Sequence, residues 1–282
     1  MTEPPRLDRP PAETFPPTYD QATPADYFRV LGALDYAMPE HVANFVRRNA
    51  PAIAAARGVS RLRVLDFGCG YGAIGALIRH DLSMAALSRA FAGHDHRADG
   101  GSGPAVLPRR QDAPALHLGG LDVASRAVAF ALRNGLIDAG FSDDLTAGAA
   151  SGALADFLAE TDLLIESGAL MAPLFVCFER MIEAGRKPWL ALAPRPDLHM
   201  APLCAMLRKH GYGLEPLSRG RIFYRRLMIS EHEPITARSA ALGRDMDDAF
   251  DGDRMFVRPC LARPLARQGG LAVGDLVLMD ED

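Results

Sequence analysis

The sequence predicts a three-layer α/β fold in which helices cover both faces of a mainly parallel sheet. The first observation is a run typical of a short buried strand, residues 63–67, followed by a glycine-rich turn and an apolar helical pattern. The second is that two further strand-like runs, within residues 116–122 and 163–166, each lead to an acidic residue and then to a helical pattern. Such alternation of strands and helices is typical of parallel sheets.

The composition is that of a globular protein in a reducing compartment. The 282 residues are 49 % hydrophobic and 23 % charged, and the net charge of −4 argues against a nucleic-acid partner. We expect neither a signal peptide nor a membrane span. The four cysteines are scattered without C-x-x-C spacing, so no zinc site or disulfide framework is predicted and a cytoplasmic protein is expected.

The chain before the first strand divides into a tail and a helical cap. Residues 1–18 contain six prolines and little periodic apolar pattern, which predicts a disordered or extended tail. Residues 19–58 show helical spacing and contain three of the six tyrosines, Tyr19, Tyr27 and Tyr36. These aromatic side chains either cover a ligand site or pack the cap against the following domain.

The turn after the first strand carries the main functional signal. Asp66 ends the strand, and glycine then occupies alternate positions, Gly68, Gly70 and Gly72. Glycine permits a tight turn and a close approach of a ligand to the backbone, and the N–H groups that begin the next helix point toward that ligand. The dinucleotide fingerprint G-x-G-x-x-G/A can be fitted to this stretch, but an acid beside the turn would repel a pyrophosphate.

The order D-x-G-x-G-x-G, from Asp66 to Gly72, resembles motif I of the class I S-adenosylmethionine (SAM)-dependent methyltransferases. The resemblance covers about residues 60–230 and implies a three-layer Rossmann-like methyltransferase sheet that binds SAM. SAM carries an ammonium group and no phosphate, so an acid near the loop is electrostatically favourable. The resemblance implies that the cofactor-binding residues are Asp66, Gly68, Cys69, Gly70, Gly72, Asp122, Val123 and Glu166.

The resemblance also implies roles for the cap and for the end of the second strand. Helices before motif I often cover the SAM pocket in this family, so Tyr19, Tyr27 and Tyr36 are candidates for a lid or for substrate contacts. The family binds ribose with the acid that ends the second strand, and this position falls on Asp122, whose two carboxylate oxygens suit a vicinal diol. A surface aspartate is the alternative.

A loop at residues 93–115 separates the first two strands more widely than the family pattern does. Glycine, proline and charged residues dominate it. It contains His94-Asp95-His96, a spacing that can ligate a metal from a strand. Because the loop is rich in glycine and shows no obvious third ligand, no metal site is predicted.

The segment after the fourth strand is where the family places the methyl group and the substrate. Glu166 and Ser167 follow Leu163–Ile165, and a helix is expected over residues 168–185. The N/D-P-P-Y type motif of enzymes that methylate DNA bases or glutamine amides is not found here, which favours a small-molecule acceptor. Ser167 fits both a substrate contact and a helix cap. Candidates for a general base are Glu166, His199 and His41, and the sequence does not decide among them.

The rest of the chain is expected to complete the sheet and then to form an extension outside it. After a fifth strand and its exit loop within residues 187–196, residues 214–217 and 221–230 fit the antiparallel pair that closes the family's sheet. The methyltransferase domain is therefore expected to span residues 59–231. Residues 232–282 are expected to form a C-terminal extension, with one further strand at residues 271–279.

Three functions remain open from the sequence. The first is methyl transfer from SAM to an oxygen, nitrogen or carboxyl group of a small molecule. The others are an NAD(P)-dependent oxidoreductase, which Asp66 and the lack of a persuasive Tyr-x-x-x-Lys pair argue against, and a non-catalytic SAM-binding protein. The expected partner is a small-molecule substrate, without nucleic acid or membrane, and a homodimer is left open.

Overall fold

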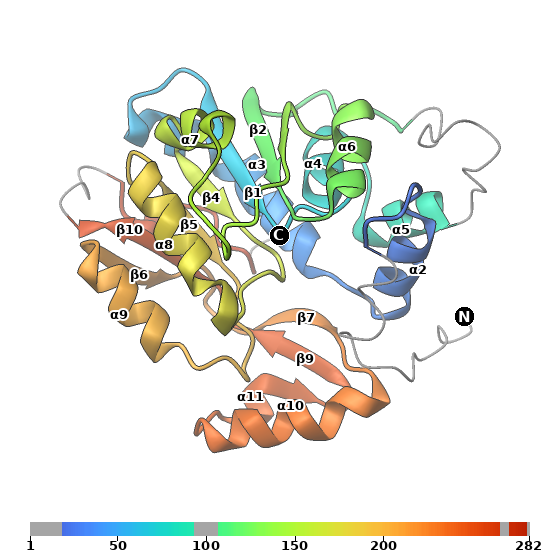
Figure 1. Cartoon of the computed structure of the whole chain (residues 1–282). Helices are drawn as coiled ribbons and strands as arrows, with labels where there is room; N and C mark the ends of the chain where they lie inside the picture. Colours follow the sequence, from blue (N-terminus) through green and yellow to red (C-terminus); the bar gives the residue numbers. More distant parts are fainter. Residues whose placement is uncertain (1–18, 93–106, 266–270, 281–282) are drawn as a thin grey trace.

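A seven-stranded sheet forms the centre of the molecule, with helices on both faces (Figure 1). The computed structural model describes residues 19–92, 107–265 and 271–280. The tail predicted for residues 1–18 and the stretch His94-Asp95-His96 lie outside the described residues. The strands of the main sheet are β1 (Leu62–Phe67), β2 (Leu116–Leu121), β3 (Ala139–Phe141), β4 (Leu163–Ile165), β5 (Trp189–Leu192), β6 (Tyr212–Pro216) and β10 (Cys260–Pro264).

The spatial order of these strands is β3-β2-β1-β4-β5-β10-β6. The pairs from β3 to β5 are parallel, and β10 is antiparallel to both β5 and β6. The strand order reverses at β1, which pairs with β2 on one side and β4 on the other. Open α/β sheets bind ligands beyond the carboxyl ends of their strands at such a reversal. The three-layer α/β prediction is therefore confirmed, and it places the site at the ends of β1, β2 and β4.

Alternate residues of β1 enter two hydrophobic cores, as expected for a strand buried on both faces. Leu62 and Val64 face the core that α3 and α4 complete, whereas Leu65 and Phe67 face the core under α7 and α8. The helices around the main sheet are α2 (Ala25–Ala33), α3 (Met38–Arg57), α4 (Ala73–Arg79), α5 (Met84–Ala92), α6 (Ser125–Arg133), α7 (Gly152–Ala159), η1 (Ala172–Leu174), α8 (Phe175–Ala184), α9 (Ala201–Lys209) and η3 (Val273–Asp275).

A roof module, defined here as residues 222–257, is inserted between β6 and β10 and lies at the lower end of Figure 1. It contacts the main domain at two seams. Backbone bonds join Ala37 to Tyr224 and Arg226 to Leu34, and the Arg244 side chain donates to the Pro196 and Leu198 carbonyls. The module comprises β7 (Ile222–Arg226), α10 (Ile229–Ala241), α11 (Met246–Ala249), β8 (Phe250–Asp251) and β9 (Arg254–Val257).

Three predictions about the end of the chain are wrong. Residues 221–230 do not pair in the main sheet, because β7 joins β9 and β8 in a separate three-stranded sheet. The strand between β5 and β6 is instead Cys260–Pro264, so the expected extension, residues 232–282, supplies part of the sheet. The strand expected at residues 271–279 is also not formed; Val273–Asp275 is a 3-10 turn there.

The structure also differs from the sequence predictions in where several helices begin, continue or end. Pro51 does not divide the helical cap: Met38–Arg57 is one helix, α3, because only one backbone bond is lost while Val46 and Ile53 stay buried on the same face. The helix expected after the glycine turn is interrupted at His80, whose extended backbone bridges to Arg109. The helix expected from residue 168 begins at Ala172, because the N–H groups of Gly168 and Leu170 bind a side chain instead.

The C-terminal segment is fastened to α3 by one buried amide. Asn49 donates to the Val277 carbonyl at 2.9 Å and accepts the Val277 N–H at 2.8 Å. Changing Asn49 to leucine leaves both backbone groups unpaired, so we expect a loss of ~2 kcal/mol and faster hydrogen exchange at Val277. Asn44→Ala, which removes only a half-buried contact with Arg47, is the control. Equal exchange rates at Val277 in the two variants would contradict this role of Asn49.

Candidate functional site

Three carboxylates converge at the carboxyl edge of the sheet. Asp66 is the fifth residue of β1, Asp122 follows β2, and Glu166 follows β4. Asp66 and Glu166 are almost completely buried, and Asp122 is half-buried. Because β1, β2 and β4 are parallel neighbours, their ends place these acids together even though 100 residues of sequence separate Asp66 from Glu166.

The loop between β1 and α4 has the backbone that its glycines permit. Gly68, Gly70 and Gly72 have φ values of 75°, 49° and 80°, a region that other residues rarely adopt. A Cβ atom at Gly68 would lie 2.6 Å from the Ala169 Cβ, so the loop also packs closely against the segment after β4. The N–H groups of Gly68 and Cys69 donate to the Leu121 carbonyl, which fastens the loop to the end of β2.

The Asp66 carboxylate is buried without a compensating cation. Burial, reinforced by the negative charges of Asp122 and Glu166, raises the pKa of Asp66 well above its ordinary value. Among the described residues, no hydrogen bond to this carboxylate is formed. A buried acid of this kind lowers its free energy when a ligand brings a positive charge or N–H donors to it.

Asp122 is held by the glycine loop and by the start of α6. Its Oδ2 accepts the Gly70 N–H at 2.9 Å, and its Oδ1 accepts the Ala124 N–H at 2.9 Å. Burial raises the pKa of Asp122, and these two hydrogen bonds oppose the rise. Each oxygen of a carboxylate has a second lone pair, so both oxygens can still accept a hydroxyl from a ligand. The side chain of the next residue, Val123, is 68 % exposed.

Glu166 connects the ends of β4 and β5. Its Oε2 accepts the N–H groups of Gly168 and Leu170 at 2.8 and 3.2 Å, and its Oε1 accepts the N–H of Ala193. Burial raises the pKa of Glu166, and these backbone hydrogen bonds oppose the rise. This geometry is that of a brace for the loops after β4 and β5.

Tyrosines of the N-terminal cap lie over the glycine loop. The Tyr19 and Tyr27 rings meet edge to face with centroids 5.1 Å apart, and a Cβ atom at Gly70 would lie 3.0 Å from the Tyr27 hydroxyl. Burial raises the pKa of Tyr19, and the charge of Asp122 adds to the rise, so Tyr19 lies near that acid. The Tyr71 hydroxyl bonds both the N–H and the carbonyl of Gln21, which ties the cap to the loop.

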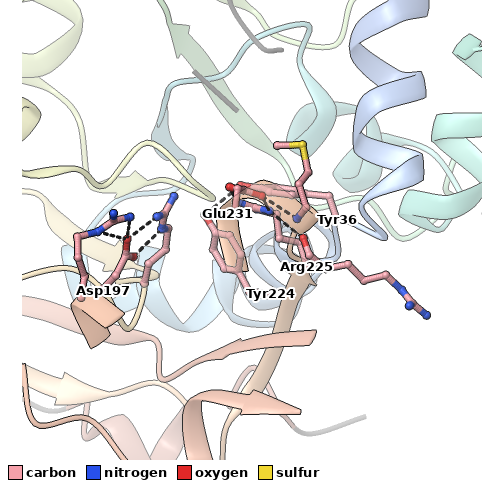
Figure 2. Close-up of polar contacts among 9 residues, drawn as sticks. Tyr36, Asp197, Tyr224, Arg225 and Glu231 are labelled. Carbon is pink, nitrogen blue, oxygen red and sulfur yellow. Dashed lines mark hydrogen bonds and ion pairs between the residues drawn. The ribbon is translucent and has the colours of Figure 1, made fainter. Parts of the chain in front are cut away.

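A second group of side chains lies between the sheet edge and the roof module (Figure 2). Tyr36 donates to the Ser167 carbonyl at 2.7 Å, and its hydroxyl lies 3.0 Å from that of Tyr224 on β7. Near Tyr224, Arg195 in the loop after β5 makes two hydrogen bonds to Asp197. Sequence reasoning did not assign Tyr224, because it expected residues 221–230 to close the main sheet; the aromatic and arginine residues around it were the available signal.

Two of the predicted base candidates lie in the loop after β5 and on α3. His199 is exposed in the loop after β5. His41 is on α3, where it lines a hollow of about 370 Å³ together with Asn44 and Arg48. The structure thus brings together the predicted residues Asp66, Gly68, Cys69, Gly70, Gly72, Asp122, Glu166, Ser167, Tyr19, Tyr27 and Tyr36.

Cys69 has a packing role in the loop. Its side chain is 3 % exposed, and a Cβ atom at Gly120 would lie 2.7 Å from its sulfur atom. Burial raises the pKa of the Cys69 thiol well above its ordinary value, which keeps the thiol protonated. Cys69 therefore fills the space that Gly120 leaves open.

The residues present fit a SAM molecule. Asp66 offers an unpartnered carboxylate to an ammonium group, and Asp122 offers two acceptor oxygens to a ribose diol. The glycine loop allows close backbone approach. The cluster of three acids suits a ligand with net positive charge and opposes a dinucleotide pyrophosphate.

Comparison with known proteins gives structural matches only. No family model matches the chain, and no curated protein sequence is similar to it. Among the solved structures, a SAM-bound magnesium protoporphyrin IX methyltransferase from Synechocystis PCC 6803 matches 85 % of this chain and 83 % of its own, with 12 % identity and a TM-score of 0.40. A SAM-dependent methyltransferase from Archaeoglobus fulgidus matches 84 % of this chain and 99 % of its own, with 14 % identity and a TM-score of 0.43.

Similarity at this level identifies no activity, so the fold assignment rests on the strand order. Five parallel strands in the order β3-β2-β1-β4-β5, closed by the antiparallel β10 and then β6, form the sheet typical of class I methyltransferases. The chain therefore has the Rossmann-like fold of the SAM-dependent methyltransferases. Within the described residues, no helix is both long enough and apolar enough to cross a membrane.

Proposed function

We propose that this protein transfers a methyl group from SAM to a small-molecule acceptor. The observation that carries the proposal is the buried Asp66 carboxylate, which lies beside the glycine loop without a partner among the described residues. Asp122 and Glu166 add negative charge around it, so the end of β1 favours a cationic ligand. These acids lie at the carboxyl ends of β1, β2 and β4, the part of an open α/β sheet at which ligands generally bind, which supports the proposal.

The chain would act mainly by binding and orientation. SAM, when bound, supplies an electrophilic methyl group on a sulfonium. Asp66 and Asp122 would fix the position of the cofactor, while the Tyr19 and Tyr27 rings would exclude water above the loop. Ser167 and Tyr36 would form the wall from which the acceptor approaches. Holding the acceptor atom in line with the methyl group and the sulfur would provide most of the rate enhancement.

The acceptor group determines whether a base is needed. A carboxylate acceptor is already a nucleophile, whereas a hydroxyl or an amine must lose a proton to a nearby base. Glu166 is held by three backbone N–H groups, His199 is exposed, and His41 lines the hollow on α3. This arrangement favours an acceptor that is ionised before it binds. The same arrangement also suits a protein that binds SAM without catalysis, which is the second candidate function.

Calorimetric titration with SAM, S-adenosylhomocysteine and NADH tests the proposal. We expect micromolar binding of SAM and S-adenosylhomocysteine, weakened ~10-fold or more in Asp122→Ala, because hydrogen bonds to an ionised group are strong. Asp156→Ala, which removes an exposed acid on α7, should bind as the wild type does. Preference for NADH, or no binding of either SAM or S-adenosylhomocysteine, would overturn the proposal. Transfer of labelled methyl groups then separates an enzyme from a binding protein.

A further inference from the structure

The roof module places a positively charged group opposite the three acids. It contacts the chain at residues 34–37, before α3, and at residues 195–198, after β5. Both segments lie at the carboxyl edge of the sheet. The module therefore covers the side of the site from which an acceptor would meet the cofactor, and its Tyr224 bonds Tyr36 there.

Asp197 is shared by two guanidinium groups, as Figure 2 shows. Arg195 donates to its two oxygens at 2.9 and 2.7 Å, and Arg238 of α10 donates to its Oδ2 at 2.8 Å. Two positive charges and one negative charge leave a surplus of one positive charge in this group. Carboxyl groups lie at the ends of β1, β2 and β4, so acidic groups line one side of the site and guanidinium groups line the other.

Arg195 keeps one edge of its guanidinium available. Its Nε and Nη2 bind Asp197, and within the described part of the chain its Nη1 makes no hydrogen bond. The side chain is 23 % exposed, so it is mostly enclosed and still reachable. Burial and the charge of Glu166 raise the pKa of the Tyr224 phenol, and the charge of Arg195 opposes that rise.

On the basis of the proposed function, we propose that the methyl acceptor carries a carboxylate, which the open edge of Arg195 binds. A guanidinium is planar and suits the geometry of a carboxylate. The rings of Tyr36 and Tyr224 meet edge to face with centroids 5.3 Å apart, and such an aromatic pair favours an aromatic body in the acceptor. A cationic cofactor on the acidic side and an anionic acceptor on the arginine side would then meet at the ends of β1 and β4.

The alternative is that Arg195 only stabilises the loop after β5. The structure offers a control for this, because Arg244 stabilises the same loop through the Pro196 and Leu198 carbonyls. Arg244→Gln therefore weakens the loop while it leaves the Arg195 charge in place. Arg195→Gln removes the charge, and Arg195→Lys keeps the charge without the planar fork.

The experiment measures binding of benzoate and 4-hydroxybenzoate, and of the matched neutral amides, to the full chain saturated with S-adenosylhomocysteine. We expect the carboxylates to bind ~10-fold more tightly than the amides in the wild type and in Arg244→Gln. Arg195→Gln should lose this preference, and Arg195→Lys should keep part of it. Thermal melting identifies any variant that fails to fold.

The outcomes separate the two proposals. If the wild type binds S-adenosylhomocysteine but binds carboxylates no better than amides, the role of Arg195 is overturned while the proposed function stands. The same holds if Arg244→Gln reduces the preference as much as Arg195→Gln does. If the wild type does not bind S-adenosylhomocysteine, the proposed function fails, and the inference fails with it.

Discussion

Asp66→Asn is expected to stabilise the unliganded protein and to weaken SAM binding ~10- to 100-fold. The buried Asp66 carboxyl lies close to two other acids, and its pKa is raised well above the ordinary value by burial and by those acids. A neutral amide removes this unfavourable charge, so the free energy of unfolding at neutral pH should rise by ~1 kcal/mol and the melting temperature by about 2 °C. The same amide cannot neutralise the ammonium group of SAM, so SAM should bind more weakly.

The ionisation of Asp66 is expected to lower the free energy of unfolding as the pH rises. Because the pKa of Asp66 is higher in the folded than in the unfolded protein, the folded protein binds more protons between the two values. The contribution of protonated Asp66 to the free energy of unfolding is therefore fully present below the unfolded pKa of about 4. It is lost as the pH rises through the folded pKa. Urea unfolding over a range of pH values should show a smaller decline for Asp66→Asn than for the wild type.

SAM binding should also release a proton when the pH lies below the folded pKa of Asp66, because a cation favours the ionised carboxylate. Calorimetry in buffers of different ionisation enthalpy measures this release. Asp156→Asn, an exposed acid on α7, controls for the change in net charge. If Asp66→Asn binds SAM with wild-type affinity, Asp66 is not the residue that receives the cationic group.

Glu166→Leu should lower the free energy of unfolding by ~3 kcal/mol or more. The substitution leaves the N–H groups of Gly168, Leu170 and Ala193 without their buried acceptor. Glu166→Gln keeps one acceptor oxygen, so a smaller loss of ~1 to 2 kcal/mol is expected. Urea unfolding measures both values. Glu160→Gln, which removes an exposed partner of Arg63, should change stability by less than ~1 kcal/mol.

The glutamine variant also tests Glu166 as a general base. If the carboxylate only holds the loops after β4 and β5, Glu166→Gln should retain most of its kcat in a methyl-transfer assay once folding is assured. A base would lose activity by about 100-fold or more and would change the pH profile of kcat. Wild-type stability of Glu166→Leu would contradict the bracing role.

Local features of the site were predictable because neighbouring residues produce them. Asp66, Gly68, Gly70 and Gly72 belong to one strand–turn–helix unit, whose backbone requires glycine wherever φ is positive. Asp122 was predictable because it ends a strand that the chain itself marks by apolar residues and a following helix. The bond from Gly70 to Asp122 follows once the two strands lie side by side.

The sequence by itself determined the alternation of strands and helices, the glycine loop and the acids at the ends of β1, β2 and β4. The tertiary structure alone decided which later segment enters the sheet. Residues 222–226 and Cys260–Pro264 are both strand-like, but a strand between β5 and β6 must bury both of its faces. Leu261 and Ala262 fill the two cores there. The paired Arg225 and Arg226 of β7 instead bind acids of the cap and the roof module, and Tyr224 between these elements reaches Tyr36 of the cap.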